Sequence, residues 1–478
     1  MSIDQAVGTD RPAENSSGLP ADTTPAPATG AIAFRPGRWI DGWNPEDQGF
    51  WESTGRRIAG TNLRWSIFCE FLGFVVWQLW SIAVVSLPAA GFKFDSSQIF
   101  WLISIPSLVG AALRIPYTFM VPRFGGRNWT VVSALLLLIP TLALSACVAN
   151  PGTPFAVMLA VAALAGFGGG NFASSMSNIT FFYPAREKGW ALGLNAAGGN
   201  LGAAVAQLVV PVAVTLGAAA TVNLPLAGLI WVPLILLAAW GARRYMHNLS
   251  HAKGDLAGSI AALKEPHLWL LAFLYIGTFG SFIGFSGVFP KLIKDFFPAF
   301  STIAVGAVAL SLAFLGPLVG SVARPYGGRL ADRFGGARMT VASFAAMAVI
   351  TLAVVFTLPL RSFWLFLGLF LLLFTASGFG NGATYRMIPA VFATAGRAAA
   401  SGAPAEERQR LAASALGLIS AIGAYGGFVI PQVLSASYTS TRSYNGAFYG
   451  FVAAYLAMLV VAWLCYLRPG GRAGAARI

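Results

Sequence analysis

Two arginines lie inside long apolar stretches of the sequence, at Arg114 and Arg324. A charged side chain at the centre of a membrane-spanning helix costs roughly 2.5 to 3.5 kcal/mol on insertion scales, so it persists there only with a partner. An arginine cannot relieve this cost by losing its proton. Among the 17 acidic residues, only Glu70 lies clearly within an apolar stretch. We therefore expect a mobile anion to supply the missing negative charge.

A less specific interpretation is that Arg114 and Arg324 hydrogen-bond to carbonyl groups near helix ends or extend to the lipid headgroups. This interpretation gives no reason for the two positions to match. Without further information, the pair fits phosphate, sulfate, carboxylate or another small anion equally well.

The surroundings of the two arginines repeat along the chain. Arg114 is followed nine residues later by Arg123-Phe-Gly-Gly, and Arg324 is followed nine residues later by Arg333-Phe-Gly-Gly. Two more pairs follow in the same order: Gly166 to Asn171 with Gly378 to Gly382, and Leu192-Gly-Leu with Leu416-Gly-Leu. The repeat predicts two halves of parallel topology, with a binding site between them.

The elements that must position these arginines are membrane helices. Of 478 residues, 56% are hydrophobic, 10% are charged and 54 are glycine, which excludes a soluble globular enzyme and a disordered protein. Apolar stretches of about 20 residues, the length that crosses a bilayer, predict twelve helices. They lie near 65–89, 98–121, 129–149, 154–182, 189–216, 223–242, 268–290, 302–325, 339–359, 363–393, 411–434 and 446–467.

The loop charges predict the orientation. If the N-terminus is inside, 23 of the 31 Lys and Arg residues lie in cytoplasmic segments and five in outer loops, which places both termini in the cytoplasm.

Residues 1–36 lack an apolar period and are expected to be disordered, while Trp39, Trp43 and Trp51 predict a segment at the membrane interface. The expected domains are a tail (1–64), a six-helix bundle (65–242), a linker (243–267), a second bundle (268–467) and a C-terminal tail (468–478).

The remaining chemistry-bearing residues predict neither catalysis nor a cofactor. The chain has a net charge of +14, and the excess positive charge belongs to the membrane domain, so we expect contact with lipids and not with nucleic acid. The three cysteines are far apart and predict reduced packing residues, and the three histidines form no metal set. We interpret Glu70 as a headgroup-level acid pairing with Arg64 or a nearby loop, with a coupled proton as the alternative. Arg386 has no first-half counterpart, which favours a structural or gate role.

Longer motifs carry a resemblance. Gly328 to Arg338 resembles the loop signature of the major facilitator superfamily, in which the acid at Asp332 would help to latch the cytoplasmic gate. The first copy of the loop, Pro122 to Arg127, has no such acid. Gly168 to Ile179, Phe181 to Gly189 and Gly193 to Gly202, with Gly378 to Pro389 in the second half, resemble the nitrate signatures of the nitrate/nitrite porter family. The segment from Trp43 to Ala59 is similar to its NarK-type branch.

The resemblance implies an all-α major facilitator fold and a set of site residues. In that family two buried arginines grip nitrate or nitrite, and they match Arg114 and Arg324. Aromatic residues that cover the anion match Phe172, Tyr275 and Phe279, although each taken alone favours core packing, and Asn200 is a further candidate donor. Residues assigned to gating or helix packing are Gly168, Gly170, Asn171, Asn195, Gly380, Asn381, Asp332, Arg338 and Arg386.

A planar, weakly hydrated anion suits a guanidinium fork. Because the predicted helices offer no acid on the substrate path except Glu70, we expect nitrate/nitrite antiport. We also expect a monomer in a bacterial inner membrane, without a cofactor. The alternatives are nitrate/proton symport, exchange of another small inorganic anion, a channel, or an anion sensor.

Overall fold

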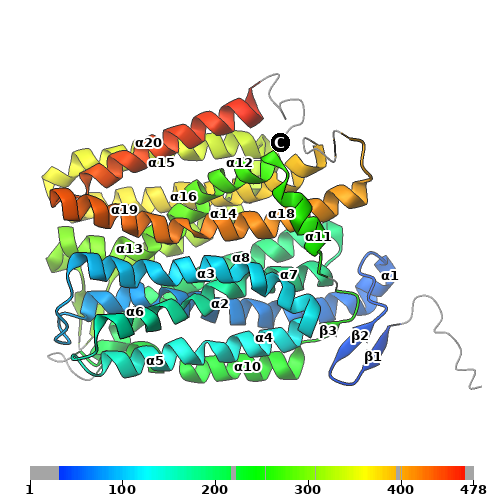
Figure 1. The fold of residues 1–478 in the computed structure, drawn as a ribbon, viewed down its shortest axis with the longest axis horizontal. Helices are drawn as coiled ribbons and strands as arrows, with labels where there is room; N and C mark the ends of the chain where they lie inside the picture. The colour runs from blue at the N-terminus through cyan, green and yellow to red at the C-terminus, as the bar shows by residue number, and fades with distance from the viewer. Residues whose placement is uncertain are drawn as a thin grey trace, which may run out of the picture.

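The helices run along a common axis, which is horizontal in Figure 1. The computed structural model describes residues 32–468 except 217–221, 253, 307, 395–398 and 400. The predicted disorder of residues 1–36 and the C-terminal tail fall almost entirely outside the described residues. The helices of the first half are α1 (Gln48–Phe50), α2 (Arg56–Ser86), α3 (Ser96–Phe124), α4 (Gly126–Leu136), α5 (Leu138–Val148), α6 (Phe155–Leu164), α7 (Gly166–Phe182), α8 (Ala185–Thr215), α9 (Leu226–Leu229) and α10 (Val232–Tyr245).

The second half continues the same pattern after a short connecting helix. Its helices are α11 (Leu256–Leu263), α12 (Pro266–Tyr275), α13 (Ser281–Phe296), α14 (Leu315–Phe334), α15 (Gly336–Thr357), α16 (Phe363–Thr394), α18 (Ala405–Ala424), α19 (Gly426–Thr441) and α20 (Asn445–Ala462). Segments of π-helix cover Trp51–Gly55, Ile276–Gly280 and Trp463–Leu467, and 3₁₀ turns cover Pro298–Phe300, Leu312–Phe314 and Leu358–Leu360.

Eleven helical stretches among the described residues are long and apolar enough to cross a membrane. Six of them join two consecutive helices: α1 with α2, α4 with α5, α6 with α7, α9 with α10, α12 with α13, and α18 with α19. The remaining long helix is α14, which is less apolar because it contains Arg324, Arg329, Asp332 and Arg333. With α14 the helices account for the predicted twelve spans.

The predicted start of the span at 302 is wrong. Residues Ile303–Val305 (β4) and Val308–Leu310 (β5) form a pair of antiparallel strands, and α14 begins only at Leu315. Gly306 between the strands has a φ of 62°, a turn conformation that glycine adopts without strain. A short apolar stretch rich in β-branched residues has the same hydropathy in a strand as in a helix, which explains the error.

The first helix starts earlier than predicted, at Arg56 instead of 65, and the tryptophans before it pack on protein. Trp43 donates a hydrogen bond from Nε1 to the Phe182 carbonyl oxygen at 3.3 Å, and Trp51 is fully buried with its ring against Tyr183. The proposed interface segment is therefore a folded part of the protein. It includes β1 (Ala33–Arg35) and β2 (Trp39–Asp41), which pair antiparallel, and β2 pairs in parallel with β3 (Asn248–Leu249) of the linker.

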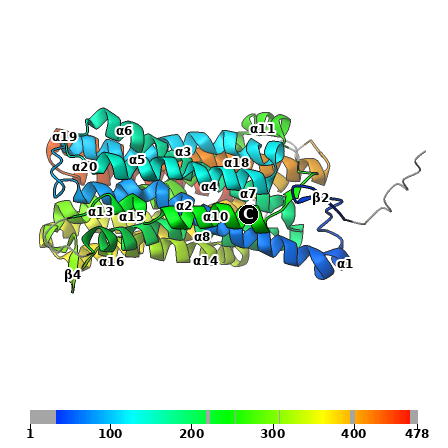
Figure 2. The same cartoon turned by 90° about the horizontal axis from the view of Figure 1, so that it is seen from below.

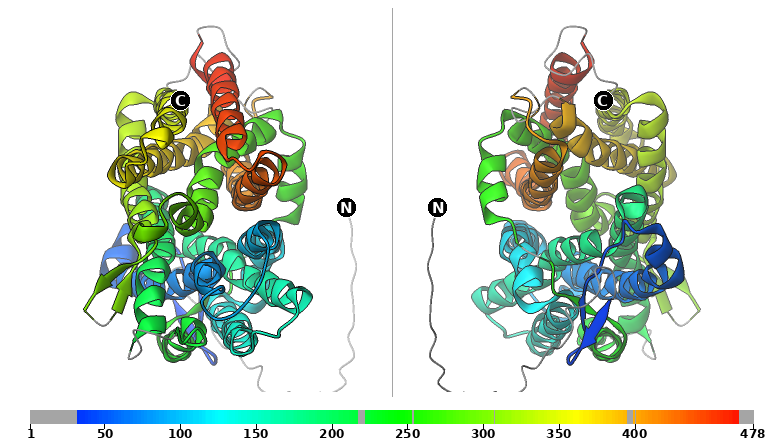
Figure 3. Two further views of the ribbon diagram at one scale, coloured as in Figure 1. Left: turned by 90° about the vertical axis from the view of Figure 1, so that its left-hand side faces the viewer. Right: turned by 90° about the vertical axis from the view of Figure 1, so that its right-hand side faces the viewer.

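We call the end of the bundle that holds this small sheet the hairpin end, and the end that holds β4 and β5 the far end (Figure 2). Seen along the helices, the elements up to α10 lie mostly on one side and those from α12 mostly on the other (Figure 3). Side-chain hydrogen bonds join the two sides toward the far end: Lys294 Nζ to Val85 O at 2.5 Å, Gln432 to Ser104 at 2.7 Å and Gln207 to the Ser286 carbonyl at 2.6 Å.

Candidate functional site

Arg114 lies in α3 with none of its surface exposed. Its Nε donates to the carbonyl oxygen of Gly169 in α7 at 3.2 Å. Its Nη1 donates to the carbonyl oxygen of Ser420 in α18 at 2.8 Å. The third nitrogen, Nη2, is buried and has no hydrogen-bond partner among the described residues. Arg114 thus joins the two halves of the chain through main-chain oxygens and keeps free donor capacity.

Arg324 occupies the corresponding place in α14 and is also buried. Its Nη2 lies 3.4 Å from the hydroxyl of Tyr275 in α12, and its Nη1 is buried without a hydrogen-bond partner in the part of the chain that the structure describes. The ring of Tyr385 in α16 lies 5.4 Å from its Cζ atom. Within the described part of the chain, neither Arg114 nor Arg324 forms an ion pair with a carboxylate.

The two arginines meet at one pair of aromatic rings. Phe172 of α7 and Phe279 of the π-helical segment are fully buried and stacked, with centroids 6.2 Å apart and planes inclined by 27°. The Cζ atom of Arg114 lies 4.4 Å from the Phe172 centroid and 5.0 Å from that of Phe279. The Cζ atom of Arg324 lies 5.9 and 6.0 Å from the same centroids. Two cationic groups and two π faces therefore converge from four different elements.

Local helix geometry places these rings. The π-helical segment Ile276–Gly280 interrupts the span of α12 and α13, a feature that is frequent at functional sites. Tyr275 and Phe279 lie on one face, as predicted, with centroids 5.4 Å apart. On α7, a Cβ atom at Gly169 would lie 2.8 Å from Gly110 Cα and 2.7 Å from the Trp77 ring. Glycine here lets α7 approach α3 closely enough for Arg114 to reach a carbonyl group.

Three predicted asparagines have unusual surroundings. Asn171, Asn200 and Asn381 are at most 3% exposed. Within the described ranges, no hydrogen-bond partner is found for the side-chain oxygen or nitrogen of any of them. A buried amide without partners is costly, so its retention calls for an explanation such as a ligand or a second conformation. Asn171 lies in α7 and Asn381 lies in α16.

The predicted glycines lie at close helix contacts. A Cβ atom at Gly168 would overlap the Gly73 carbonyl oxygen, and one at Gly170 would lie 2.9 Å from the Tyr117 ring. In the second half, a Cβ atom at Gly380 would lie 2.8 Å from Thr278 Cγ2.

Glu70 does not lie at headgroup level as we had predicted. It is fully buried, and Ser175 donates to its Oε2 at 2.5 Å while Asn195 Nδ2 donates to the same oxygen at 2.6 Å. Arg64, the proposed partner, instead bonds to Gly60 O and Thr61 within its own helix. The prediction was wrong because α2 begins nine residues before the apolar stretch, which moves Glu70 deeper into the bundle.

The predicted gate residues lie at the hairpin end of the second half. Arg386 Nε forms an ion pair with Asp332, and both side chains are more than half exposed. This contact ties α16 to the end of α14. Arg338, which follows in α15, is exposed.

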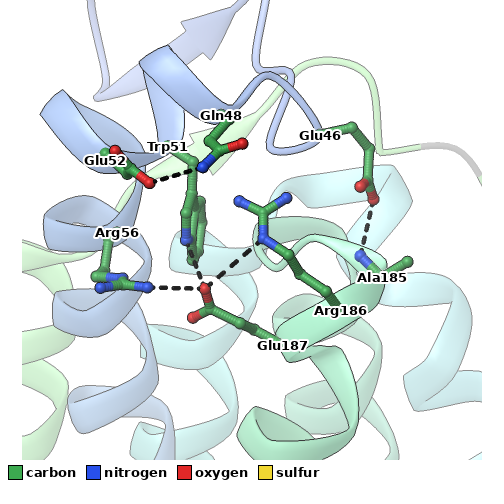
Figure 4. A network of polar contacts seen from close by, with 8 residues as sticks. All are labelled: Glu46, Gln48, Trp51, Glu52, Arg56, Ala185, Arg186 and Glu187. Atoms are coloured by element: carbon green, nitrogen blue, oxygen red, sulfur yellow. Dashed lines mark hydrogen bonds and ion pairs between the residues drawn. The ribbon is translucent and has the colours of Figure 1, made fainter.

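A second network at the hairpin end was not predicted (Figure 4). Glu187, near the start of α8, accepts hydrogen bonds from Trp51 Nε1 at 2.8 Å and Arg56 at 2.9 Å. Glu46 accepts one from the Ala185 main-chain N–H at 2.8 Å. The network attaches the N-terminal segment to the first turn of α8. Neither Glu187 nor Trp51 belongs to a repeated motif, so no residue pattern indicated their pairing.

Sequence reasoning also missed Ser420, Trp77 and Tyr385 as neighbours of the arginines. The Cζ atom of Arg114 lies 5.5 Å from the Trp77 ring. Ser420 contributes a main-chain oxygen, which any residue type could supply, so no side-chain pattern could have marked it.

Comparison with known proteins gives a consistent result. The sequence model described as Major Facilitator Superfamily matches residues 67–431. The nitrate/nitrite transporter NarU of Salmonella typhimurium is 43% identical over 451 residues, which cover 90% of this chain and 96% of that protein. The probable nitrate/nitrite antiporter NarK2 of Thermus thermophilus is 36% identical, with 91% and 98% covered.

Solved structures share the fold at low identity. A bacterial homologue of the human lysosomal transporter Spinster, in an inward-facing and occupied conformation, matches with a TM-score of 0.58 and 17% identity, covering 84% of this chain and 94% of that one. The nucleoside transporter NupG (D323A mutant) matches with a TM-score of 0.58 and 13% identity, covering 84% and 98%.

Proposed function

Since the chain belongs to the major facilitator superfamily and, within it, to the nitrate/nitrite porter family, we propose that it transports nitrate and nitrite across a membrane and exchanges one for the other. The proposal extends to Arg114 and Arg324 as the anion grip, to Phe172, Tyr275 and Phe279 as its aromatic walls, and to Asn200 as an additional donor. No chemical conversion of the anion is involved.

One observation supports the proposal most strongly. Arg114 Nη2 and Arg324 Nη1 are buried donors that have no partner among the residues the structure describes. Both guanidinium groups lie against the Phe172–Phe279 pair. A planar anion with delocalised charge can accept hydrogen bonds in its plane while its faces contact rings. Nitrate and nitrite have this shape and charge.

The transport cycle follows from how the halves are joined. Hydrogen bonds between them lie toward the far end, at Lys294, Gln432 and Gln207, and at the central Arg114. With the hairpin end in the cytoplasm, as the arginine-rich loops favour, the structure corresponds to a state closed to the outside. Rocking of one half on the other would break the far-end contacts and close the hairpin end. In this cycle Asp332 and Arg386 hold α14 to α16, and the close glycine contacts let the helices move as units.

A second candidate, nitrate/proton symport, is favoured by a specific residue. Glu70 is a buried acid within electrostatic range of both arginines, and proton carriers in membranes are usually acids or histidines.

Counterflow in proteoliposomes tests the proposal. Labelled nitrate should enter vesicles loaded with nitrite or nitrate and should not accumulate in vesicles loaded with an impermeant buffer. Robust uptake into vesicles free of both anions, driven by a pH gradient alone, would replace antiport by proton symport. A current that is independent of the anion on the opposite side would instead indicate a channel.

The cellular setting completes the proposal. We place the protein as a monomer in the bacterial inner membrane. Both termini would lie in the cytoplasm, because the Lys and Arg residues are strongly concentrated in the segments at the hairpin end. Its partners would be the two anions and the surrounding lipids, without nucleic acid. Accessibility of single cysteines introduced at exposed loop positions, in whole cells, measures this orientation.

A further inference from the structure

Glu70 lies in a closely fitted polar pocket between three helices. Its Oε2 accepts hydrogen bonds from Ser175 of α7 and Asn195 of α8, and Ser175 is 3.0 Å from Ser66 of α2. A Cβ atom at Gly199 of α8 would overlap Oε1, so only glycine leaves space for the carboxylate. Oε1 itself is buried, and no described residue forms a hydrogen bond with it. Donors are thus directed at one oxygen, an arrangement that suits an ionised carboxylate.

The charges acting on this carboxylate come from the candidate anion site. Arg324 and Arg114 are the charged side chains within electrostatic range of Glu70, and no ion pair joins either of them to it among the described residues. The other titratable groups nearby are the phenols of Tyr275 and Tyr385, which interact with both arginines. The two arginines and an ionised Glu70 together leave the centre of the protein with one net positive charge.

We propose that Glu70 is a fixed counter-charge of the anion site, so that the site becomes electrically neutral when it binds one monovalent anion. This inference rests on the proposed function. An uncompensated charge in a low-dielectric interior is costly, so the neutral, loaded site is the one that can be enclosed between the halves. Nitrate and nitrite both satisfy the condition. An empty site, and a site with a divalent anion, do not.

The counter-charge also keeps anion binding reversible. Two arginines without a nearby acid would hold an anion tightly, whereas transport needs binding that is weak enough for release. Removing the negative charge of Glu70 should therefore tighten binding and slow turnover together. A purely structural role would lower turnover without tightening binding, so the two explanations differ in a measurable way.

The test compares the full-length protein with Glu70→Gln, which keeps the shape of the side chain. In calorimetric titrations with nitrate, we expect the variant to bind roughly tenfold more tightly, equivalent to about 1.4 kcal/mol. In exchange assays both its KM and its maximal rate should fall. Sulfate in large excess should compete for nitrate binding in Glu70→Gln and not in the unmodified protein.

Two further variants serve as controls. Glu70→Asp keeps the negative charge and should keep the rejection of sulfate. Glu52→Gln removes an exposed acid that accepts a hydrogen bond from Gln48, and its nitrate affinity should not change.

Several outcomes would overturn the inference. One is unchanged nitrate affinity in a folded Glu70→Gln. Another is nitrate uptake that a pH gradient drives in the unmodified protein and that Glu70→Gln abolishes, since Glu70 would then carry a proton. If Glu70→Gln does not fold, effective competition by sulfate in the unmodified protein decides against the counter-charge. Failure of the unmodified protein to bind nitrate or nitrite would instead reject the proposed function.

Discussion

Nη1 of Arg114 donates a hydrogen bond to the main-chain carbonyl oxygen of Ser420 at 2.8 Å, across 306 residues of sequence. The bond joins α3 of the first half to α18 of the second half at the centre of the bundle. Any rocking of the halves must change this contact. An anion bound at Nη2 would then be held by a side chain that is also hydrogen-bonded to the other half.

Substituting either central arginine by lysine tests the guanidinium geometry. Arg114→Lys and Arg324→Lys keep the charge but lose the planar fork, so we expect nitrate exchange to fall at least about tenfold. Exchange is measured as counterflow of labelled nitrate in proteoliposomes. Arg123→Lys, an exposed arginine near the end of the same helix as Arg114, is the control and should transport normally. Near-normal exchange by either central variant would show that these residues do not grip the anion.

The Tyr275 hydroxyl contributes a smaller effect. It lies 3.4 Å from Arg324 Nη2 and helps to orient that side chain. Tyr275→Phe should raise the KM for nitrate a few-fold, in keeping with the loss of about 1 kcal/mol for one hydrogen bond, and should leave protein yield unchanged. Tyr455→Phe removes a hydroxyl that is bonded to Ser281, away from the arginines, and is the matched control. Equal KM values for the two variants would contradict an orienting role for Tyr275.

The arginine pair could be predicted from the sequence because a charged residue inside an apolar stretch is conspicuous and the spacing to the next arginine recurs. The aromatic walls were not, since a phenylalanine in a membrane helix is ordinarily core, and only family resemblance selected Phe172 and Phe279. Glu70 was placed at the wrong depth because polar residues 56–64 form the first turns of α2 and hydropathy does not register them. The Gly169 and Ser420 contacts depend on tertiary approach through main-chain oxygens, which no residue pattern specifies.

The ion pair of Asp332 and Arg386 should matter for transport more than for stability. Both side chains are more than half exposed, so the pair should contribute at most about 1 kcal/mol to folding. Asp332→Asn and Arg386→Gln should leave the melting temperature nearly unchanged and lower the exchange rate several-fold. The double exchange Asp332→Arg with Arg386→Asp should recover part of that rate. If the single variants exchange nitrate at the full rate, the pair is not part of the gate.

His247 makes the attachment of the N-terminal hairpin sensitive to acid. Burial, together with the positive charges of Arg38 and Arg127, lowers the pKa of His247 to about 4. Arg38 can only donate, so the contact between its Nη2 and His247 Nε2 at 2.9 Å requires a neutral ring.

The pKa of His247 is lower in the folded protein than its ordinary value of 6.5, so the unfolded chain binds more protons than the folded protein as pH falls below 6.5. The stability that the neutral His247 ring contributes is therefore lost as pH falls from 6.5 toward 4. The advantage in melting temperature of the unmodified protein over His247→Asn should shrink as pH falls from 7.5 to 5. A constant difference would rule out titration of His247.

Two glycines offer a matched pair for the close packing of the helices. A Cβ atom at Gly168 of α7 would overlap the carbonyl oxygen of Gly73 in α2, where both partners are main chain and cannot move aside. Gly168→Ala should therefore destabilise the protein, by about 1 to 3 kcal/mol as overpacking commonly does, and lower the melting temperature. A Cβ atom at Gly193 of α8 meets nothing within 4 Å, so Gly193→Ala should be neutral or slightly stabilising because alanine favours a helix. Both are measured by thermal unfolding of the purified protein in detergent. Equal melting temperatures would mean that α2 and α7 can separate without cost, and the glycine contact would then have no part in holding the first half as a rigid unit.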